Sequence, residues 1–144
     1  MSISYARLAA LIDGEPQADA REHLLYHGPQ LDVVVMRDGE AQTVRGIVDT
    51  GSGITAVDTS LVEGLEPCDE RDMVEFSSRT RTPHYRLCVS VAGATVEVVR
   101  AVDMSLLRAQ APSLKVVIGR DMLTSLVMVY DGRRGEFRLL SEDD

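Results

Sequence analysis

The chain reads Ile47-Val48-Asp49-Thr50-Gly51-Ser52, and this stretch decides how the rest of the sequence is interpreted. Its two β-branched apolar residues end a strand, and an acid follows them at once. Gly51 permits a tight turn with positive φ, and the neighbouring hydroxyls can bond to backbone or to the carboxylate. A carboxylate at the end of a buried strand costs solvation free energy unless it is hydrogen-bonded or has a use. The stretch therefore predicts a tight loop that presents Asp49, although the tripeptide alone would also fit an acid that begins an ordinary turn.

Outward from this loop, the sequence is typical of short strands joined by close turns. Residues 31–36 and 42–48 flank Asp38-Gly39, which is a strong hairpin signal. Further strands are expected at residues 54–57, 73–76, 85–91, 95–102, 114–118, 127–130 and 136–140. A turn of helix is expected at residues 59–62, a polar hairpin tip at residues 77–82, and a short helix at residues 120–126. This pattern predicts a mainly β, partly closed domain with one short C-terminal helix.

Length and composition exclude several classes of protein. A chain of 144 residues is the size of one domain, and 44% hydrophobic with 26% charged residues is an ordinary globular composition. The formal net charge of -8 argues against nucleic acid or an anionic membrane as the main partner, because both attract a basic surface. No apolar run approaches the roughly 18 residues that a membrane-spanning helix needs.

The first part of the chain differs from the rest. Residues 1–28 are expected to form a helical N-terminal extension, and residues 29–144 the main domain. Apolar residues recur at helical spacing between Tyr5 and Ile12, and a second helical stretch is expected at residues 17–26. An extension packed on the domain is favoured over a regulatory or pro-segment. The first residues lack the long apolar core of a signal peptide, so we expect a cytoplasmic protein.

Cysteines and histidines give no metal-binding pattern. Cys68 and Cys88 fit no zinc spacing, and the three histidines are scattered. Two buried or half-buried free thiols are favoured over a disulfide, and the acidic neighbours of Cys68 disfavour a reactive thiolate. We therefore expect no metal and no cofactor.

A second element follows about 70 residues after Asp49. It reads Val116-Val117-Ile118-Gly119-Arg120-Asp121, an apolar strand, a glycine and the start of a short helix. Together, the two elements resemble the retropepsin family, the single-lobe aspartic proteases of retroviruses and their cellular and bacterial relatives. The resemblance covers roughly residues 31–140, and we take the chain for a bacterial or cellular member. It implies the retropepsin-like fold, a closed β-barrel-type acid protease fold.

The resemblance also implies roles for individual residues. Asp49 would be the catalytic acid, with Thr50 beneath the active site bonding to its counterpart across a dimer. Gly51 would let the backbone approach the substrate, and Ser52 would steady the carboxylate. The step that supports the loop from below would consist of Val117, Ile118, Gly119 and Arg120. The flap that closes over a bound peptide would consist of Ser77, Ser78, Arg79, Thr80, Arg81 and Thr82.

Two positions depart from the viral pattern. Viral members usually carry an acid two residues after the motif glycine, where it pairs with the helix arginine. Here that position is Gly53, so Arg120 must have another partner or face solvent. The expected flap tip lacks glycines and carries Arg79 and Arg81 instead. Closure over the substrate and specificity are therefore expected to differ.

The chemistry of the family requires two carboxylates. A water is held between carboxylates about 3 Å apart, one ionised as general base and one protonated as general acid. Since this chain has one Asp-Thr-Gly, a symmetric homodimer with both Asp49 residues on its two-fold axis would supply the pair. The expected function is that of an aspartic endopeptidase, a hydrolase acting on a peptide or protein substrate. The alternative is a non-catalytic retropepsin-fold module for dimerisation or peptide binding.

Overall fold

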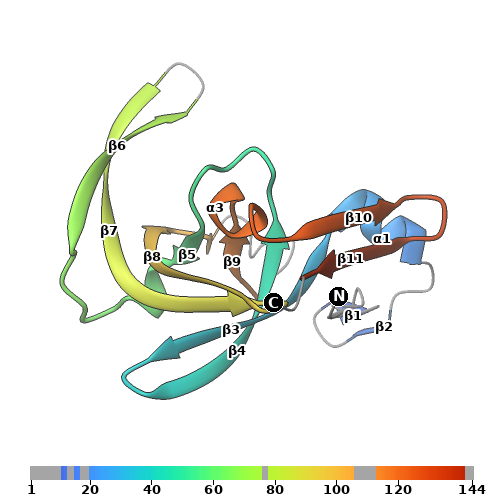
Figure 1. The fold of residues 1–144 in the computed structure, drawn as a ribbon, viewed down its shortest axis with the longest axis horizontal. Helices are drawn as coiled ribbons and strands as arrows, with labels where there is room; N and C mark the ends of the chain where they lie inside the picture. Colours follow the sequence, from blue (N-terminus) through green and yellow to red (C-terminus); the bar gives the residue numbers. More distant parts are fainter. Residues whose placement is uncertain (1–10, 13–14, 17–19, 76–77, 106–112, 142–144) are drawn as a thin grey trace.

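Strands dominate the molecule (Figure 1). The computed structural model describes residues 11–12, 15–16, 20–75, 78–105 and 113–141. Seven strands form one sheet in the spatial order β3-β4-β9-β5-β8-β7-β6. Their bounds are β3 (Gln30–Arg37), β4 (Glu40–Val48), β5 (Ala56–Asp58), β6 (Asp69–Glu75), β7 (Ser78–Val91), β8 (Ala94–Val102) and β9 (Leu114–Ile118). β3 also pairs with β7, so the strands from β3 to β7 in this order close into a barrel and β6 lies outside it. The predicted mainly β, closed-barrel architecture is confirmed.

The β3–β4 hairpin shows why the sequence forms this barrel. Leu31, Val33 and Val35 point into the core, and the residues between them are exposed, which is the alternation of a strand with one buried face. At the turn, Asp38 and Gly39 have φ values of 53° and 79°. Positive φ at both central residues defines the tight turn whose twist matches its strands. The predicted hairpin is confirmed.

Strand β9 runs through the middle of the sheet. It pairs in parallel with β4, placing Val48 beside Ile118, and antiparallel with β5, placing Val57 beside Val116. Both edges of β9 are therefore paired, and along the strand buried residues alternate with half-buried ones. Val116 and Ile118 are fully buried in the core. The strand ends at residue 118, as predicted.

The remaining elements are short. They comprise β1 (Leu11–Ile12), β2 (Glu15–Pro16), α1 (Ala20–His27), the 3-10 helix η1 (Thr59–Leu61), α3 (Arg120–Leu123), β10 (Val127–Asp131) and β11 (Glu136–Leu140). β10 and β11 pair as a separate hairpin, which extends away from the barrel on the side opposite β6 and β7 (Figure 1). In the described part of the chain, no helix is long and apolar enough to cross a bilayer.

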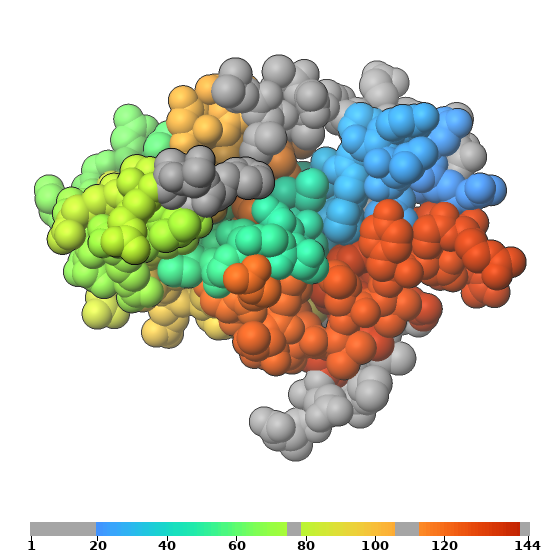
Figure 2. Space-filling view, turned by 90° about the horizontal axis from the view of Figure 1, so that it is seen from above, coloured from blue at the N-terminus to red at the C-terminus, as the bar shows by residue number. Residues whose placement is uncertain are grey.

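Helix α1 packs against the C-terminal hairpin. Leu24 belongs to the same buried cluster as Phe137 and Leu139 of β11. Gly135, with φ of 67°, lies so close to α1 that an added Cβ would come within 2.5 Å of the Ala20 carbonyl carbon. Figure 2 shows α1, in blue, against the orange and red C-terminal hairpin. This part of the extension is therefore packed on the domain.

Two sequence expectations need correction in this region. The helical spacing between Tyr5 and Ile12 does not give a helix at its end, because Leu11–Ile12 pairs as a strand with Glu15–Pro16. Residues 1–10 lie outside the described part. The second helix, expected at residues 17–26, is observed at Ala20–His27, and it ends where Gly28 adopts a positive φ of 72°.

Two other elements are shorter than expected. Strand β5 begins at Ala56 rather than at residue 54, since the Thr55 amide donates to the Asp121 carboxylate instead of a strand. Helix α3 ends at Leu123 rather than at residue 126. After Thr124, single turns carry the chain directly into β10, with the Leu126 amide bonded to the Leu123 carbonyl.

Candidate active site

The Asp49 loop follows the end of β4, and backbone hydrogen bonds fix its position. The Asp49 amide donates to the Ile118 carbonyl at 2.9 Å, which joins the loop to β9. The Asp49 carboxylate accepts the Gly51 amide at 2.8 Å. The side chain is exposed, so the loop presents a carboxylate to solvent with its orientation fixed by a backbone N–H.

Ser52 braces the loop without touching the carboxylate. Its side chain is buried, and its Oγ donates to the Ile54 carbonyl at 2.8 Å. Its amide donates to the Asp49 carbonyl at 3.2 Å. The direct support expected from Ser52 therefore comes from the Gly51 amide, and Ser52 acts on the backbone instead. Thr50 is exposed.

Gly119 explains why the supporting step needs a glycine. A Cβ at this position would lie 2.6 Å from the Ile54 carbonyl carbon and 2.9 Å from the Thr55 nitrogen, closer than real contacts allow. The Gly119 amide also donates to Thr55 Oγ1 at 3.1 Å. The backbone of residue 119 therefore lies directly against the end of the Asp49 loop. Val117, which precedes Ile118, pairs with Ile47 of β4 and Ala56 of β5, so the expected support residues meet the loop.

Arg120 has a partner despite the glycine at position 53. Its Nη1 donates to the Thr50 carbonyl at 2.8 Å, and its amide donates to the Ser52 carbonyl at 2.8 Å. Its Nη2 lies 3.4 Å from where a Gly53 Cβ would be. Arg120 thus holds the loop through backbone carbonyls on both sides of Gly51.

Asp121 and Thr55 form a second brace that the sequence interpretation missed. The Asp121 carboxylate accepts the Thr55 amide at 3.0 Å and the Thr55 hydroxyl at 2.8 Å. It also accepts the Met122 amide at the start of α3, where an acid is stabilised by unpaired N–H groups. The sequence signal that could have indicated this brace was Asp121, an acid in the first turn of the expected helix. Its partner could not be inferred, because the two residues meet only in the folded chain.

The flap prediction needs correction. β6 pairs with β7 in a register that places Glu75 opposite Ser78, so strand pairing extends through most of the predicted tip. Ser77 lies outside the described part of the chain. The other predicted tip residues are in strand β7: Ser78, Arg79, Thr80, Arg81 and Thr82. The hairpin itself exists, and it projects beyond the barrel (Figure 1).

Opposite charges across the hairpin explain why this polar stretch is a strand. Across the hairpin, Arg81 of β7 lies 2.8 Å from Glu70 of β6, and within β6 Arg71 lies 2.9 Å from Asp69. The hydrogen bond from Arg71 comes first among the causes that lower the pKa of Asp69. Cross-strand pairs of opposite charge favour such a pairing even without apolar side chains.

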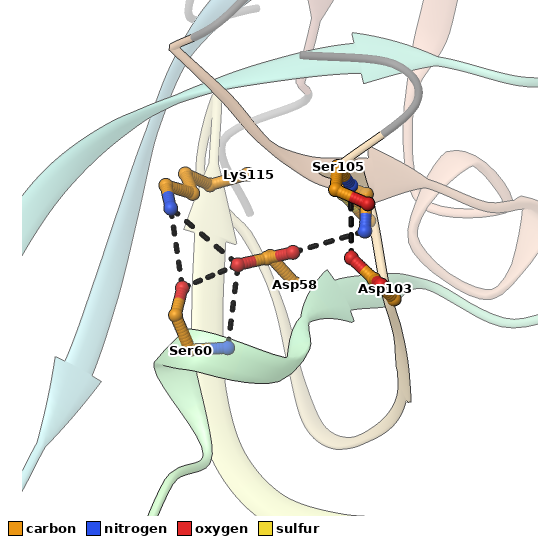
Figure 3. A network of polar contacts seen from close by, with 6 residues as sticks. Asp58, Ser60, Asp103, Ser105 and Lys115 are labelled. Carbon is orange, nitrogen blue, oxygen red and sulfur yellow. Dashed lines mark hydrogen bonds and ion pairs between the residues drawn. The ribbon is translucent and has the colours of Figure 1, made fainter.

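A buried polar network lies at the end of β5 (Figure 3). Asp58 is fully buried, and its carboxylate accepts bonds from the Ser60 hydroxyl and amide and from the Met104 amide at 3.0 Å. Lys115 Nζ lies 3.4 Å away. Burial alone would raise the pKa of Asp58, but the Ser60 and Met104 hydrogen bonds and the Lys115 charge outweigh it and lower the pKa to about 2. This network connects three elements, which are η1, the segment that follows β8, and strand β9.

Within the described residues, no three His, Cys, Asp or Glu side chains come together as a metal site. Cys68 and Cys88 are both free thiols, as expected, but Cys68 is exposed and Cys88 alone is half-buried.

No family model matches the sequence, and no curated protein matches it. Among solved structures, the chain is similar to the solution structure of Simian Foamy Virus (mac) protease, with 16% identity and a TM-score of 0.45 over 66% of this chain and 91% of that one. It is also similar to the foamy viral protease-reverse transcriptase in complex with an RNA/DNA hybrid, with 20% identity and a TM-score of 0.43 over 67% of this chain and 12% of that one.

Proposed function

We propose that this protein is an aspartic endopeptidase whose active site is formed by two copies of the chain, each contributing one Asp49. The observation that carries the proposal is the way the loop holds this side chain. Asp49 is exposed, accepts the Gly51 amide, and rests on a loop braced by Arg120 and Gly119. The hydrogen bond of the Arg120 guanidinium goes to the Thr50 carbonyl, which leaves the carboxylate available for chemistry.

The reaction follows from placing two such carboxylates side by side. Like charges about 3 Å apart cannot both ionise readily, so the pair keeps one proton. The ionised carboxylate takes a proton from a bound water as its oxygen attacks the peptide carbonyl carbon, and the protonated one supports the carbonyl oxygen. When the C–N bond breaks, a proton passes to the leaving nitrogen. The products are a carboxylic acid and an amine, and no cofactor is consumed.

The rest of the molecule supports this proposal in two ways. The β6–β7 hairpin is an element that can cover a bound peptide, and the ion pair of Arg81 with Glu70 joins its two strands. The free thiols Cys68 and Cys88 support a cytoplasmic location, where thiols stay reduced. We further propose that the protein is a bacterial or cellular member of the retropepsin family, because the order of the barrel, the Asp49 loop, the hairpin and the Gly119-Arg120 step agrees with the resemblance.

The test compares the wild type with Asp49→Asn in cleavage of an unfolded protein substrate over a broad pH range. Asp38→Asn is the matched control, since Asp38 is an exposed turn residue and asparagine tolerates its positive φ. We expect cleavage by the wild type and the control, and none by Asp49→Asn. Equal cleavage by Asp49→Asn would overturn the proposal. Absence of cleavage by all three would favour a non-catalytic dimerisation or peptide-binding module.

A further inference from the structure

Two histidines lie one helical turn apart on helix α1. His23 and His27 are four residues apart, and side chains at this spacing lie above one another on a helix. Their ring centroids are 5.4 Å apart, and the ring planes are inclined by 37°. The third histidine of the chain, His84, lies on strand β7. We call His23 and His27 the α1 histidine pair.

The first member of this pair is buried with its polar atoms unused. The His23 side chain is 2% exposed, and neither of its ring nitrogens has a hydrogen-bond partner among the described residues. A buried polar group without a partner costs free energy, and an apolar side chain of similar size would fill the same space without this cost. An imidazole nitrogen with an unused lone pair is a common metal ligand. The position therefore favours a ligand for the ring over a role in packing.

The separation of the two rings matches that of two imidazoles bound to one metal ion. Zinc–nitrogen bonds are about 2.0–2.1 Å long, and a ring nitrogen lies about 1.1 Å from its ring centre, so each centroid would lie about 3.2 Å from the ion. At a tetrahedral angle, two such centroids are about 5 Å apart. The observed centroid separation of 5.4 Å is therefore close to what a shared ion requires.

The groups around the pair bear on which ion it prefers. Burial, followed by the charges of His27 and Arg45, lowers the pKa of His23, and the neutral ring is the form that binds a metal. Arg45 opposes a cation, but its guanidinium lies 3.7 Å from the Asp32 carboxylate, which offsets its charge. Imidazole ligands suit zinc, copper and nickel ions, whereas magnesium and calcium prefer oxygen ligands.

We propose that the α1 histidine pair binds a zinc ion, with water in the remaining coordination positions. No group of three or more His, Cys, Asp or Glu side chains forms a metal site among the described residues, so this site has two protein ligands. His27 is half-buried, which gives the ion a route from solvent. The site goes beyond the proposed function and does not rest on it, since α1 lies on the side of the molecule opposite β6 and β7 (Figure 1).

A bound ion stabilises the attachment of α1 to the domain. Ligands four residues apart meet one ion only while the helix is formed, so the folded chain binds zinc more tightly than the unfolded chain. Leu24, on the same helix, belongs to the buried cluster that contains Phe137 and Leu139. The Gln30 side chain donates to the His27 carbonyl at 3.0 Å, which joins the end of α1 to β3. Zinc therefore strengthens the contacts of α1 with β11 and β3.

The test measures zinc binding by isothermal titration calorimetry on the full chain with Cys68→Ser and Cys88→Ser, because free thiols also bind zinc. His27→Ala is compared in this background with Tyr26→Ala, a matched control at a 73% exposed position of the same helix. Loss of a ligand costs at least as much as loss of an outer-shell partner, which costs about 10–100-fold. We expect one zinc ion per chain, an affinity about 100-fold lower in His27→Ala, and no change in Tyr26→Ala. Absence of binding by the background chain, or equal affinity in His27→Ala, would overturn the inference.

Thermal unfolding tests the second ligand and the attachment of the helix. At a zinc concentration of about 100 times the dissociation constant, the melting temperature of the background chain should rise by about 5 °C or more. Magnesium at the same concentration should leave it unchanged. His23→Leu keeps an apolar fit in the buried position, and its melting temperature should not respond to zinc. An equal rise in His23→Leu shows that zinc binds elsewhere and contradicts the proposed site.

Discussion

Asp49 follows strand β4 and Asp58 ends strand β5 of the same sheet, and the surroundings of their carboxylates are opposite. Asp58 is fully buried, accepts bonds from Ser60 and Met104, and faces Lys115. Asp49 is exposed and accepts the Gly51 amide. A carboxylate whose lone pairs are saturated by the protein stabilises the fold, and one that is oriented but still accessible can act on a substrate. The same isosteric substitution at the two positions should therefore separate activity from stability.

The largest expected effect is a loss of activity on substitution of Asp49. Asp49→Asn should lower the rate of peptide cleavage by about 1,000-fold or more, because it removes the ionisable group of the proposed pair. Because the side chain is exposed, the free energy of unfolding should stay within about 0.5 kcal/mol of the wild type. Cleavage kinetics and urea unfolding on the same preparation measure both. A large loss of stability would mean that Asp49 is structural, like Asp58.

The second effect is a loss of stability on substitution of Asp58. Asp58→Asn should lower the free energy of unfolding by about 3 kcal/mol, because it leaves Lys115 without its counter-charge and turns an NH₂ group toward backbone donors. Thermal or urea unfolding at pH 7 measures the loss. If the variant is as stable as the wild type, the network in Figure 3 contributes nothing and the contrast with Asp49 disappears.

The pH dependence of this loss has a defined sign. The folded pKa of Asp58 is about 2, below its ordinary value of 3.8, so its contribution is fully present above that ordinary value. It disappears as the pH falls toward the folded pKa. The difference between wild type and Asp58→Asn should therefore shrink between pH 4 and pH 2. A difference that stays constant over this range would exclude the ionised carboxylate as its source.

A smaller loss of stability is expected at Gly119, whose backbone lies against the end of the Asp49 loop. Gly119→Ala should lower the free energy of unfolding by about 2 kcal/mol, because its Cβ would meet Ile54 at 2.6 Å. Gly132→Ala is the control, since its Cβ meets only the Tyr130 ring at 3.4 Å. Cleavage should fall in Gly119→Ala even under conditions where the protein is fully folded, as judged by circular dichroism. Unchanged cleavage would show that the position of Asp49 does not depend on this contact.

The smallest effect concerns a histidine far from the loop. His23 is buried, and neither of its ring nitrogens has a hydrogen-bond partner among the described residues. Burial, followed by the charges of His27 and Arg45, lowers its pKa from 6.5. The unfolded chain therefore binds a proton more readily, and stability falls as the pH drops below 6.5. His23→Leu should weaken this dependence in urea unfolding at pH 7.5 and 5.5, and an identical slope would contradict it.

Much of this structure could be predicted from local patterns in the sequence. The turn at Asp38 and Gly39 and the limits of β9 follow from conformational preference and apolar runs, which act over a few residues. Asp49 and Gly119 stood out because a loop and its close backbone contact restrict which residues can occupy them.

Other features depend on contacts between distant residues. The bond from Thr55 to Asp121 shortens β5, and no local signal reports it. Residues 77–82 are polar, so they predicted a solvent-exposed tip, but residues 78–82 lie in strand β7, and the ion pair between Arg81 and Glu70 stabilises this pairing. The docking of α1 depends on Leu24 reaching the core, which its weakly amphipathic sequence does not indicate.

The separation between Asp49 and its support has a consequence for protein synthesis. The carbonyl of Thr50 is bonded by Arg120, 70 positions later in the chain. At a ribosomal rate of about 5–20 residues per second, the support emerges roughly 4–14 s after the loop. A nascent chain therefore carries its aspartate through about half of its synthesis without the brace that orients it. Premature termination before position 120 would leave a polypeptide that cannot assemble the loop, so ordering of the aspartate is delayed until most of the chain has been made.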